Sequence, residues 1–284
     1  MQDILKSNTP AFVFDTAALK KRVAQIKEIV GETVSLCYSM KANPFFVPAM
    51  ITCVDKLEVC SPGELTICKK LGVDASRIIY SGVNKEIPDI KEAYEYGVGT
   101  FTAESVRQAD LIQQVVETAA AGEKAEVILR LNSGSQFGMS KEDLLTILQC
   151  RESKYTSLNF TGIHYFVGTQ RKRAKRKIKE LQMLLELFEE IQNKYGLKLK
   201  KLEYGPGFAV PYFEDDDFED TLYPVKELKD TLKQVAQQVD LTIEMGRFFT
   251  AECGTYYTNV ADLKTVGNAH YCILDGGMNH LPYL

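Results

Sequence analysis

The chain of 284 residues is 45% hydrophobic and 25% charged, with a formal net charge of −4 at pH 7. This composition is typical of a soluble protein that buries a large core, and it gives no reason to expect a nucleic acid or a membrane as partner. No apolar run reaches the roughly 18 residues of a membrane span and no signal peptide opens the chain, so we expect a cytoplasmic protein. The seven cysteines form no C-x-x-C pair and the three histidines do not cluster, which predicts reduced thiols and no metal site.

Short β-rich runs alternate with longer segments of helical periodicity along the chain. The runs predict strands at Ser35–Met40, Leu57–Cys60, Ile78–Ser81, Gly99–Thr102, Val127–Asn132, Gly162–Val167, Lys201–Tyr204 and Leu241–Glu244. Because parallel strands need crossover connections, the alternation predicts a parallel sheet with helices around it. Eight such units predict an α/β fold, a (β/α)8 TIM barrel. An open doubly wound sheet is the alternative, but the glycine-rich fingerprint after its first strand is missing.

Two further segments with strand character lie outside the eight units. Ala11–Asp15 precedes the barrel and Tyr271–Leu274 follows it, so the two are candidates to pair with each other in a second domain. We therefore expect the N-terminal strand and linker of a β-domain in residues 1–24, the barrel in 25–264, and the start of a C-terminal β-domain in 265–284. Only seven residues follow the Gly276-Gly277 turn, which predicts that this β-domain is truncated.

Reactive groups of a TIM barrel lie at the C-terminal ends of its strands. Lys41 follows the first strand, where burial would lower its pKa and free its amine for Schiff-base chemistry, unless it is an ordinary surface lysine. Gly205-Pro206-Gly207 follows the seventh strand and could approach a phosphate or form a simple turn. Glu244 and Arg247 end the eighth and could be a surface ion pair, while His164 on the sixth could be a satisfied core residue.

Taken together and in order, these motifs resemble the fold-type III pyridoxal phosphate (PLP) enzymes. This is the diaminopimelate, ornithine and arginine decarboxylase family, whose barrel is similar to that of alanine racemase. The resemblance runs through the whole chain, in Tyr38-x-x-Lys41-Ala42-Asn43, Glu58 to Leu65 with its Gly63-Glu64-Leu65, Leu129-Arg130-Leu131-Asn132, Gln136-Phe137-Gly138, Glu244-x-Gly246-Arg247 and Asp275-Gly276-Gly277-Met278-Asn279.

The resemblance implies PLP-dependent decarboxylation of an amino acid, with PLP held by Lys41 as a Schiff base. Glu244 would face the pyridine nitrogen and keep it protonated, where alanine racemases have an arginine. Arg130 and Glu58 would form a supporting charge pair near Lys41. The other residues expected to contact the cofactor are Gly205, Gly207, Gly246 and Arg247 at the phosphate, with His164, Phe166 and Thr169 on the sixth strand and its loop.

Two departures from the family pattern affect the expected substrate. Many family decarboxylases have a second histidine where this chain has Phe166, and a phenyl ring can stack on the cofactor but cannot donate a hydrogen bond. Many also have a middle glycine where this chain has Pro206, which offers no N–H to a phosphate. Relatives that act on an amino acid tethered to an acyl carrier protein also have an aromatic residue at the Phe166 position. The substrate is therefore expected to be a small amino acid, free or carrier-linked.

A basic run follows the sixth strand directly, from Arg171 to Lys179, and seven of its nine residues are Lys or Arg. The run is either a solvated helix face or a landing site for an acidic partner such as a carrier protein.

Family decarboxylases complete their active site with the C-terminal β-domain of a partner subunit, so a homodimer is expected for the full-length protein. The C-E-S-x-D motif of that domain is not found in this sequence. The alternatives to a decarboxylase are a racemase, which Glu244 disfavours, a non-catalytic PLP-binding barrel, and a barrel that has lost its cofactor.

Overall fold

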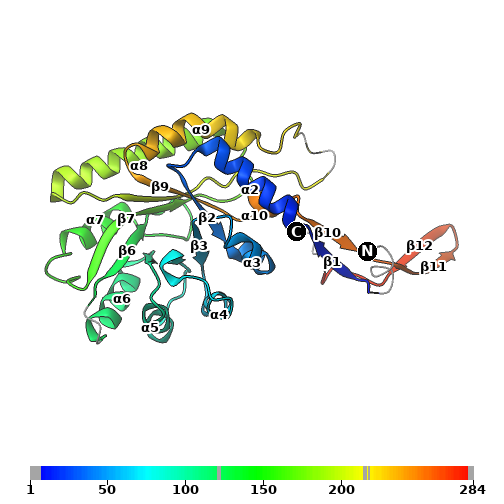
Figure 1. Ribbon diagram of the computed structural model, residues 1–284, viewed down its shortest axis with the longest axis horizontal. Coiled ribbons are helices and arrows are strands. Elements are labelled where there is room, and N and C mark those ends of the chain that lie inside the picture. Colours follow the sequence, from blue (N-terminus) through cyan, green and yellow to red (C-terminus); the bar gives the residue numbers. More distant parts are fainter. Residues whose placement is uncertain (1–7, 120–122, 214–215, 217, 281–284) are drawn as a thin grey trace.

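The computed structural model describes residues 8–119, 123–213, 216 and 218–280. Its centre is a closed barrel of eight parallel strands (Figure 1). The barrel strands are β2 Ser35–Ser39, β3 Lys56–Val59, β4 Ile78–Tyr80, β5 Thr100–Ala103, β6 Ala125–Arg130, β7 Leu158–Phe166, β8 Lys201–Gly205 and β9 Asp240–Met245. Pairing of β2 with β9, with Cys37 opposite Glu244, closes the barrel. The predicted TIM barrel and all eight predicted strands are confirmed, although β7 begins at Leu158 rather than Gly162.

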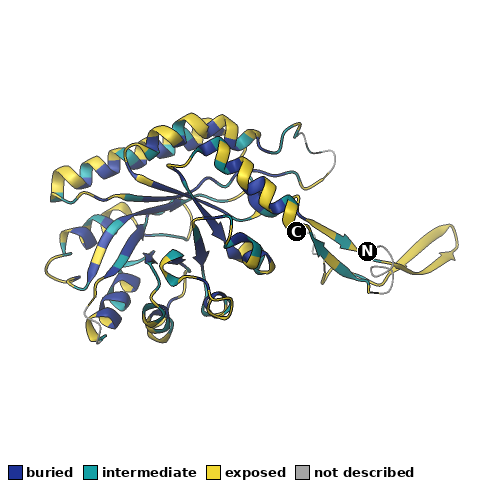
Figure 2. Cartoon of the chain, viewed as in Figure 1, coloured by how far each residue is buried: buried dark blue, intermediate teal, exposed yellow. Residues whose placement is uncertain are grey.

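Helices surround the barrel and cover the outer face of its strands. They are α2 Thr16–Val30, α3 Val47–Met50, α4 Pro62–Lys70, α5 Ile87–Tyr96, α6 Val106–Thr118, α7 Lys141–Gln149, α8 Ala174–Tyr195, α9 Tyr223–Ala236 and α10 Arg247–Thr250, with short 3-10 turns η1 Met40–Ala42, η2 Pro44–Phe46 and η3 Ala75–Arg77. Helix α2 shows why these segments form: Asp15 accepts hydrogen bonds from Ala17 N and Ala18 N and so caps the first turn. Its buried residues, from Leu19 to Val30, recur on one face that packs on the barrel (Figure 2).

The main hydrophobic core lies between the strands and this outer layer of helices. A second, small apolar cluster of Cys37, Ile79 and Ile128 is formed by residues that the strand register turns into the barrel. Toward the C-terminal ends of the strands, the inward positions become polar. They carry Ser39, Glu58, Thr102, His164, Glu203 and Glu244, all buried. The fold therefore collects ionisable groups at one end of the barrel.

The strands that flank the barrel do not pair as the sequence suggested. Strand β1 (Ala11–Phe14) pairs with β10 (Gly254–Tyr257), and β12 (Ala269–Leu274) pairs with β11 (Val260–Val266). The prediction that the strands at Ala11–Asp15 and Tyr271–Leu274 pair with each other is therefore wrong. A two-residue turn, Gly267-Asn268, joins β11 to β12 as a hairpin, and this local closure leaves β10 for β1.

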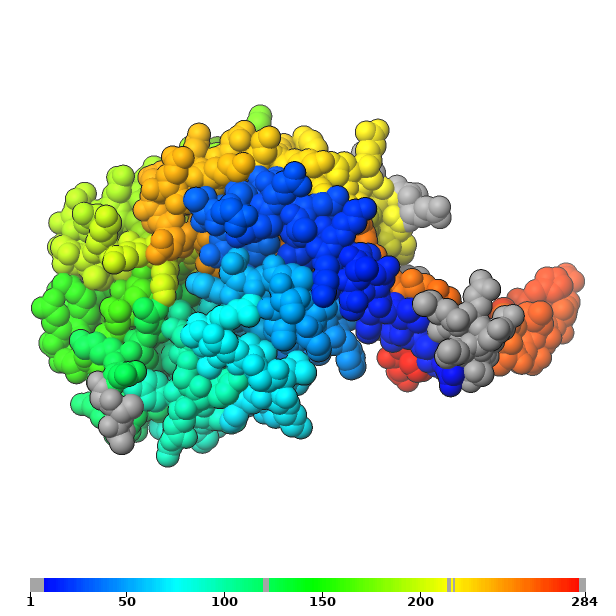
Figure 3. Space-filling view, viewed as in Figure 1, coloured from blue at the N-terminus to red at the C-terminus, as the bar shows by residue number. Residues whose placement is uncertain are grey.

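The β11–β12 hairpin extends away from the barrel (Figures 1 and 3), and its residues are exposed. Asp275, which follows β12, accepts hydrogen bonds from Thr9 Oγ1 at 2.5 Å and Thr258 Oγ1 at 2.7 Å. It thereby joins the N-terminal segment to the β10–β11 connection. The division of the chain at residues 24 and 264 stays a prediction.

Candidate active site

Lys41 lies in the turn η1, directly after β2, where the sequence motif predicted a reactive lysine. Its Nζ is 2.9 Å from Glu58 Oε2 on β3 and 3.6 Å from Glu244 Oε1 on β9. The Lys41 side chain is 48% exposed, whereas both carboxylates are almost wholly buried. An amine at the rim of the barrel is thus held above two acidic groups in its interior.

The charge state of this cluster differs from the prediction. Burial lowers the pKa of Lys41, but the Glu58 and Glu244 carboxylates outweigh it and raise the pKa well above its ordinary value. The expectation of a lowered Lys41 pKa, which considered burial alone, is therefore wrong. Burial also raises the pKa of Glu244, yet Lys41 and a hydrogen bond with His164 hold it well below its usual range. The pair is an ammonium and a carboxylate.

Glu58 and Arg130 do not form the expected charge pair. Glu58 accepts hydrogen bonds from Lys41 Nζ and from Ser39 Oγ. Arg130, on β6, instead donates through Nη1 to Glu104 Oε2 at 2.9 Å, and its guanidinium lies 5.0 Å from the Phe137 ring centroid. The prediction failed because Glu104, just after the adjacent strand β5, is the nearer carboxylate, whereas Glu58 lies on β3 beside Lys41.

A cavity of about 300 Å³ opens above the Lys41 cluster. Seven of the residues predicted to bind the cofactor line it, namely Lys41, Phe166, Thr169, Gly207, Glu244, Gly246 and Arg247. Phe166 forms part of the wall, with its ring centroid 5.9 Å from Lys41 Nζ. His164 lies below, with Nε2 at 3.1 Å from Glu244 Oε2. The structure therefore brings together most of the predicted site, and Arg130 is the member that pairs elsewhere.

The glycines at the strand ends let backbone and side chains approach closely. Gly207 has φ of +57°, and a Cβ there would lie 1.8 Å from the carbonyl oxygen of Gly168. A Cβ on Gly205 would lie 2.4 Å from the Phe166 ring, so this glycine makes room for that ring. Pro206 between them has no N–H, so it offers no backbone donor to an anion here.

The loops after β7 and β8 are joined at the edge of the cavity. Gln170 exchanges hydrogen bonds with the backbone of Val210, donating through Nε2 at 2.8 Å and accepting from the N–H at 2.9 Å. The backbone N–H of Arg171 donates to the Gly207 carbonyl at 2.9 Å, and its guanidinium pairs with Glu180. These contacts fix the loop that carries Thr169 relative to Gly207.

Two cations of the basic run are directed inward rather than to solvent. Arg171 is held by Glu180, and Lys177 is buried, donating through Nζ to the Arg171 carbonyl at 2.6 Å. The exposed members of the run, which we call the basic face, are Lys172, Arg173, Lys175, Arg176 and Lys179. A docking surface on this run would therefore be formed by these five.

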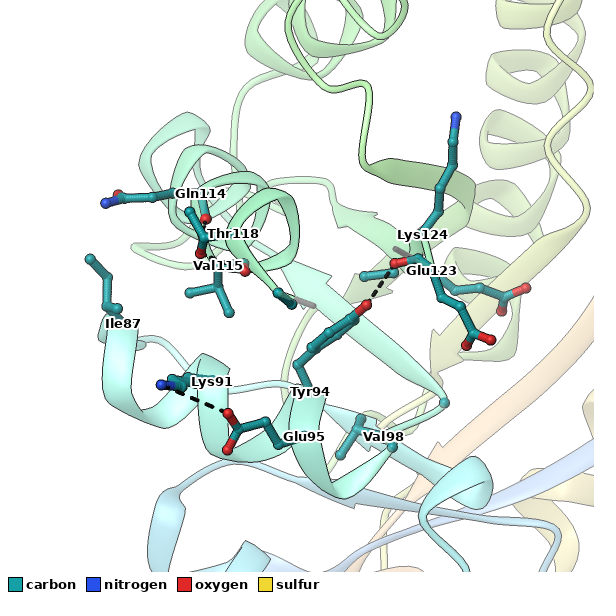
Figure 4. Close-up of a pocket in the computed structure, with 15 residues that line it drawn as sticks. Ile87, Lys91, Tyr94, Glu95, Val98, Gln114, Val115, Thr118, Glu123 and Lys124 are labelled. Atoms are coloured by element: carbon teal, nitrogen blue, oxygen red, sulfur yellow. Dashed lines mark hydrogen bonds and ion pairs between the residues drawn. The ribbon is translucent and has the colours of Figure 1, made fainter. Parts of the chain in front are cut away.

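A larger cavity of about 700 Å³ lies between α5 and α6 (Figure 4). Within it, the Tyr94 hydroxyl donates to the Glu123 carbonyl at 2.6 Å, and Lys91 Nζ lies 3.8 Å from Glu95 Oε1. Lys124 on its wall precedes β6, so this cavity lies at the N-terminal ends of the strands. Because TIM-barrel enzymes place their chemistry at the opposite ends, the cavity at Lys41 is the candidate active site.

Comparison with known proteins identifies the family. Residues 16–251 match the family model described as "Pyridoxal-dependent decarboxylase, pyridoxal binding domain". The chain belongs to the pyridoxal-dependent decarboxylases. The family's cofactor is PLP. The matched residues run from α2 through α10 and so include all eight strands of the decarboxylase barrel.

Curated relatives and solved structures extend the comparison. The chain is 27% identical to diaminopimelate decarboxylase of Aquifex aeolicus, over 96% of this chain and 67% of that protein. It is 28% identical to L-glutamyl-(BtrI acyl-carrier protein) decarboxylase of Niallia circulans, over 96% and 68%. The crystal structure of lysine decarboxylase from Selenomonas ruminantium superposes with a TM-score of 0.84 at 25% identity, covering 98% of this chain and 74% of that one. This decarboxylase chain thus spans about two thirds to three quarters of the length of these relatives.

The donor set of the cavity fits PLP. The cofactor has an aldehyde that bonds to an amine, a pyridine nitrogen, an aromatic ring and a phosphate. The decarboxylase cavity offers the Lys41 amine, the ionised Glu244, the Phe166 ring and the Arg247 guanidinium. Each chemical feature of PLP therefore has a complementary group on the wall.

Several residues in and below this decarboxylase site were not predicted from sequence. Ser39 hydrogen-bonds to Glu58, Gln170 fixes the loop, and Glu203 is buried beneath Glu244 in the strand register. Strand alternation would have found two of them, because Ser39 and Glu203 share the inward face with Cys37 and His164. No local signal indicates the hydrogen bonds of Gln170 with Val210.

The described part of the chain includes no helix long and apolar enough to cross a membrane.

Proposed function

We propose that Lys41, Glu58 and Glu244 are the residues with which this decarboxylase holds PLP and an amino-acid substrate. The observation that carries the proposal is the Lys41 amine, held at 2.9 Å and 3.6 Å from two buried carboxylates at the rim of one cavity. When bound, PLP supplies the electron sink that accepts the electron pair left by the departing carboxylate.

Each residue of the cluster has a separate task in this proposal. Lys41 supplies the amine that bonds to the cofactor, and Glu58 Oε2 is the acceptor nearest to its proton. Glu244 stays ionised and stabilises a protonated ring nitrogen, because opposite charges favour each other's charged forms. Phe166 packs on the ring, which orients it without hydrogen bonding.

The phosphate would be bound by residues that follow β7, β8 and β9. Arg247 supplies positive charge, and its guanidinium lies 5.1 Å from the Tyr212 ring centroid, which limits its freedom. Gly207, Gly246 and Thr169 line the same cavity and would contact the phosphate, and Gly205 lies at the end of β8. Arg130 has no direct task, because it is engaged by Glu104.

A direct experiment on Lys41 tests these assignments. The protein is incubated with PLP and the visible absorbance of the PLP–lysine adduct is recorded for the wild type, Lys41→Ala, and the exposed control Lys20→Ala. We expect the band in the wild type and the control and its loss in Lys41→Ala. A band of equal strength in Lys41→Ala would show that another amine binds the cofactor.

We further propose that the substrate is an amino acid, either free or carried on an acyl carrier protein. The relatives named above act on diaminopimelate, lysine or a carrier-linked glutamyl group, according to their names. Phe166 and the exposed basic face beside the loops of β7 and β8 support the carrier-linked class, because a carrier protein presents an acidic surface. Carbon dioxide release from diaminopimelate, lysine, ornithine, arginine and carrier-linked glutamate distinguishes the classes.

Charge reversal tests the basic face separately. Arg173→Glu/Arg176→Glu removes two exposed cations, and Lys20→Glu/Lys21→Glu on α2 makes the same change in net charge elsewhere. We expect only the first variant to raise the KM for a carrier-linked substrate, with turnover of free amino acids unchanged. Equal KM values for both variants would remove the carrier from the proposal.

Homodimer formation and a cytoplasmic location complete the proposed function. The exposed apolar side chains of the hairpin, such as Leu263 and Val266, support a contact with another subunit. Seven free cysteines support a reducing compartment. Sedimentation of the purified protein tests the dimer, and fractionation of the source cells tests the location.

A further inference from the structure

Glu203 is a third glutamate inside the barrel, and the proposed function gives it no task. It lies on β8 and is 2% exposed. Among the described residues, neither of its carboxyl oxygens has a hydrogen-bond partner, whereas Glu58 and Glu244 are both engaged. A buried carboxyl group without a partner is costly as an anion, so its presence needs a physical reason.

The strand register places Glu203 next to His164. Glu203 is opposite His164 of β7 and Thr242 of β9, and partners in a parallel ladder point to the same face. His164 is also buried, and its Nδ1 is another described side-chain atom without a partner. Two unpaired polar groups therefore lie side by side on neighbouring strands, both directed into the barrel.

His164 needs a hydrogen-bond donor at Nδ1 because its other nitrogen, Nε2, interacts with Glu244. Nε2 lies 3.1 Å from Glu244 Oε2, and since Glu244 is held ionised, Nε2 carries the proton and donates it. In a neutral imidazole, Nδ1 is then an acceptor. A carboxylic acid on Glu203 has the O–H that this acceptor lacks.

The surroundings of Glu203 favour its protonated form. Burial raises its pKa well above the ordinary value, and the charges of Glu244 and Glu58 raise it further. Lys56 and Lys41 act in the opposite direction without reversing the shift. The groups that face Glu203 are Glu58 and Lys56 on β3, Lys41 in η1, Cys37 on β2, Glu244 on β9 and His164 on β7.

We propose that Glu203 is a positioning residue that holds a proton in the floor of the barrel and, through His164, fixes the proton on Nε2 that faces Glu244. This inference rests on the proposed function in one respect: the charge of Glu244 matters for decarboxylation because Glu244 would face the ring nitrogen of PLP. The arrangement is a chain from Glu203 O–H through one water to Nδ1, and from Nε2–H to the Glu244 carboxylate.

The proton stays on the Glu203 oxygen in this arrangement. The negative charge of the cluster therefore stays at Glu244, where it also faces Lys41.

Infrared spectroscopy of the protein without cofactor tests the protonation of Glu203. A protonated carboxyl group has a C=O band separate from those of carboxylates, and we expect such a band at neutral pH in the wild type. It should be lost in Glu203→Gln and kept in the exposed control Glu186→Gln. A wild-type spectrum identical in this region to that of Glu203→Gln would overturn the proposal.

The pH dependence of folding stability is a second test of whether Glu203 is protonated. Because the folded pKa is raised, the unfolded chain loses this proton first as pH rises, and the folded state is progressively destabilised. Relative to Glu203→Gln, the wild type should therefore lose stability in urea between acidic and neutral pH. An unchanged difference between the two proteins across this range would contradict a buried acid.

Nitrogen NMR of the imidazoles tests the connection to His164. The chain has three histidines, and His164→Gln assigns the buried one. Glu203→Gln keeps an N–H donor for Nδ1 and should keep the wild-type tautomer, whereas Glu203→Met removes the donor and should shift both ring nitrogens. Equal spectra for Glu203→Met and the wild type would show that Glu203 does not act through His164.

These measurements separate the inference from the proposed function. All three measurements are made without PLP, so they still test Glu203 even if Lys41 does not bind the cofactor. If PLP binds, the Met variant should in addition lower kcat without raising KM. If Glu203→Met does not fold, Glu203→Gln still decides the protonation through the infrared band and the stability profile.

Discussion

His164 and Glu244 meet at 3.1 Å between Nε2 and Oε2, in a part of the barrel where both side chains are almost wholly buried. The other oxygen of Glu244 faces Lys41. One carboxylate thus connects the floor of the barrel to the amine at its rim. Its charge is maintained by two partners from two strand ends, so a change at either partner alters the electrostatics at Lys41.

Glu244→Gln tests the importance of this charge. Glutamine has nearly the same shape but cannot be ionised, so the opposite charge for a protonated ring nitrogen is lost. We expect kcat to fall by roughly two to three orders of magnitude, the usual cost of removing one preorganised electrostatic group. Steady-state kinetics on the substrate found by the carbon dioxide screen, at saturating PLP, measures this. The exposed Glu186→Gln should keep wild-type kcat, and a similar kcat for Glu244→Gln would rule out the assigned task.

The barrel and most of the site follow from sequence because they depend on local patterns. Strand alternation sets which residues face inward, and the TIM-barrel rule places Lys41, Gly207 and Glu244 at one end of the barrel. Lys41 and Glu244, far apart in sequence, are neighbours because β2 and β9 close the barrel. The order of the motifs was sufficient to predict this.

The pairings that failed depend on three-dimensional choices between similar partners. Arg130 pairs with Glu104, which follows the adjacent strand β5, and the sequence gives no local signal that selects Glu104 over Glu58. The strand β10 is four residues long and follows α10 almost directly, so its pattern does not separate it from a helix end. The pKa of Lys41 depends on the Glu58 and Glu244 carboxylates, which come from distant parts of the sequence. An expectation based on burial alone therefore gave the wrong direction for the shift.

The Arg130–Glu104 pair yields a stability prediction. Both side chains are nearly buried, at 11% and 12% exposed. Arg130→Ala leaves the Glu104 carboxylate without its partner, and we expect a loss of about 3 kcal/mol of unfolding free energy. Urea denaturation measures it. A double-mutant cycle with Glu104→Gln should show strong coupling, while a cycle with Glu58→Gln should show coupling below about 0.5 kcal/mol. Strong coupling to Glu58 would instead restore the pair expected from sequence.

Gly207→Ala tests the close approach of the two loops at the cavity. Its φ of +57° is unfavourable for alanine, and the new Cβ would collide with the Gly168 carbonyl oxygen. Strain and overpacking together predict a loss of about 3 kcal/mol and weaker PLP binding. Gly196→Ala is the matched control, because its φ is +62° with no atom within 4 Å, and it should cost only about 1 kcal/mol. Urea denaturation and a PLP absorbance titration separate the two; equal losses would show that the collision is relieved by loop movement.

Lys85, in the loop after β4, gives a prediction on pH. It is 1% exposed and donates through Nζ to the Gly82 carbonyl at 2.6 Å and to Gln108 Oε1 at 3.1 Å. Burial lowers the pKa of Lys85 to about 8, although the Glu104 carboxylate opposes the shift. Between about pH 8 and the ordinary lysine value of about 10.4, the unfolded chain therefore binds more protons than the folded one.

Stability contributed by Lys85 consequently rises with pH in that window and is lowest below pH 8, where the folded protein must hold a buried ammonium. Lys85→Met removes this dependence, so the stability of the wild type minus that of the variant should increase between pH 8 and 10. Taking the difference cancels the contributions to stability of the tyrosines and cysteines that titrate in the same pH range. Lys91→Met, at a side chain that is 64% exposed, should give a flat difference. A flat difference for Lys85 as well would mean that its ammonium is stabilised by water that enters beneath the loop.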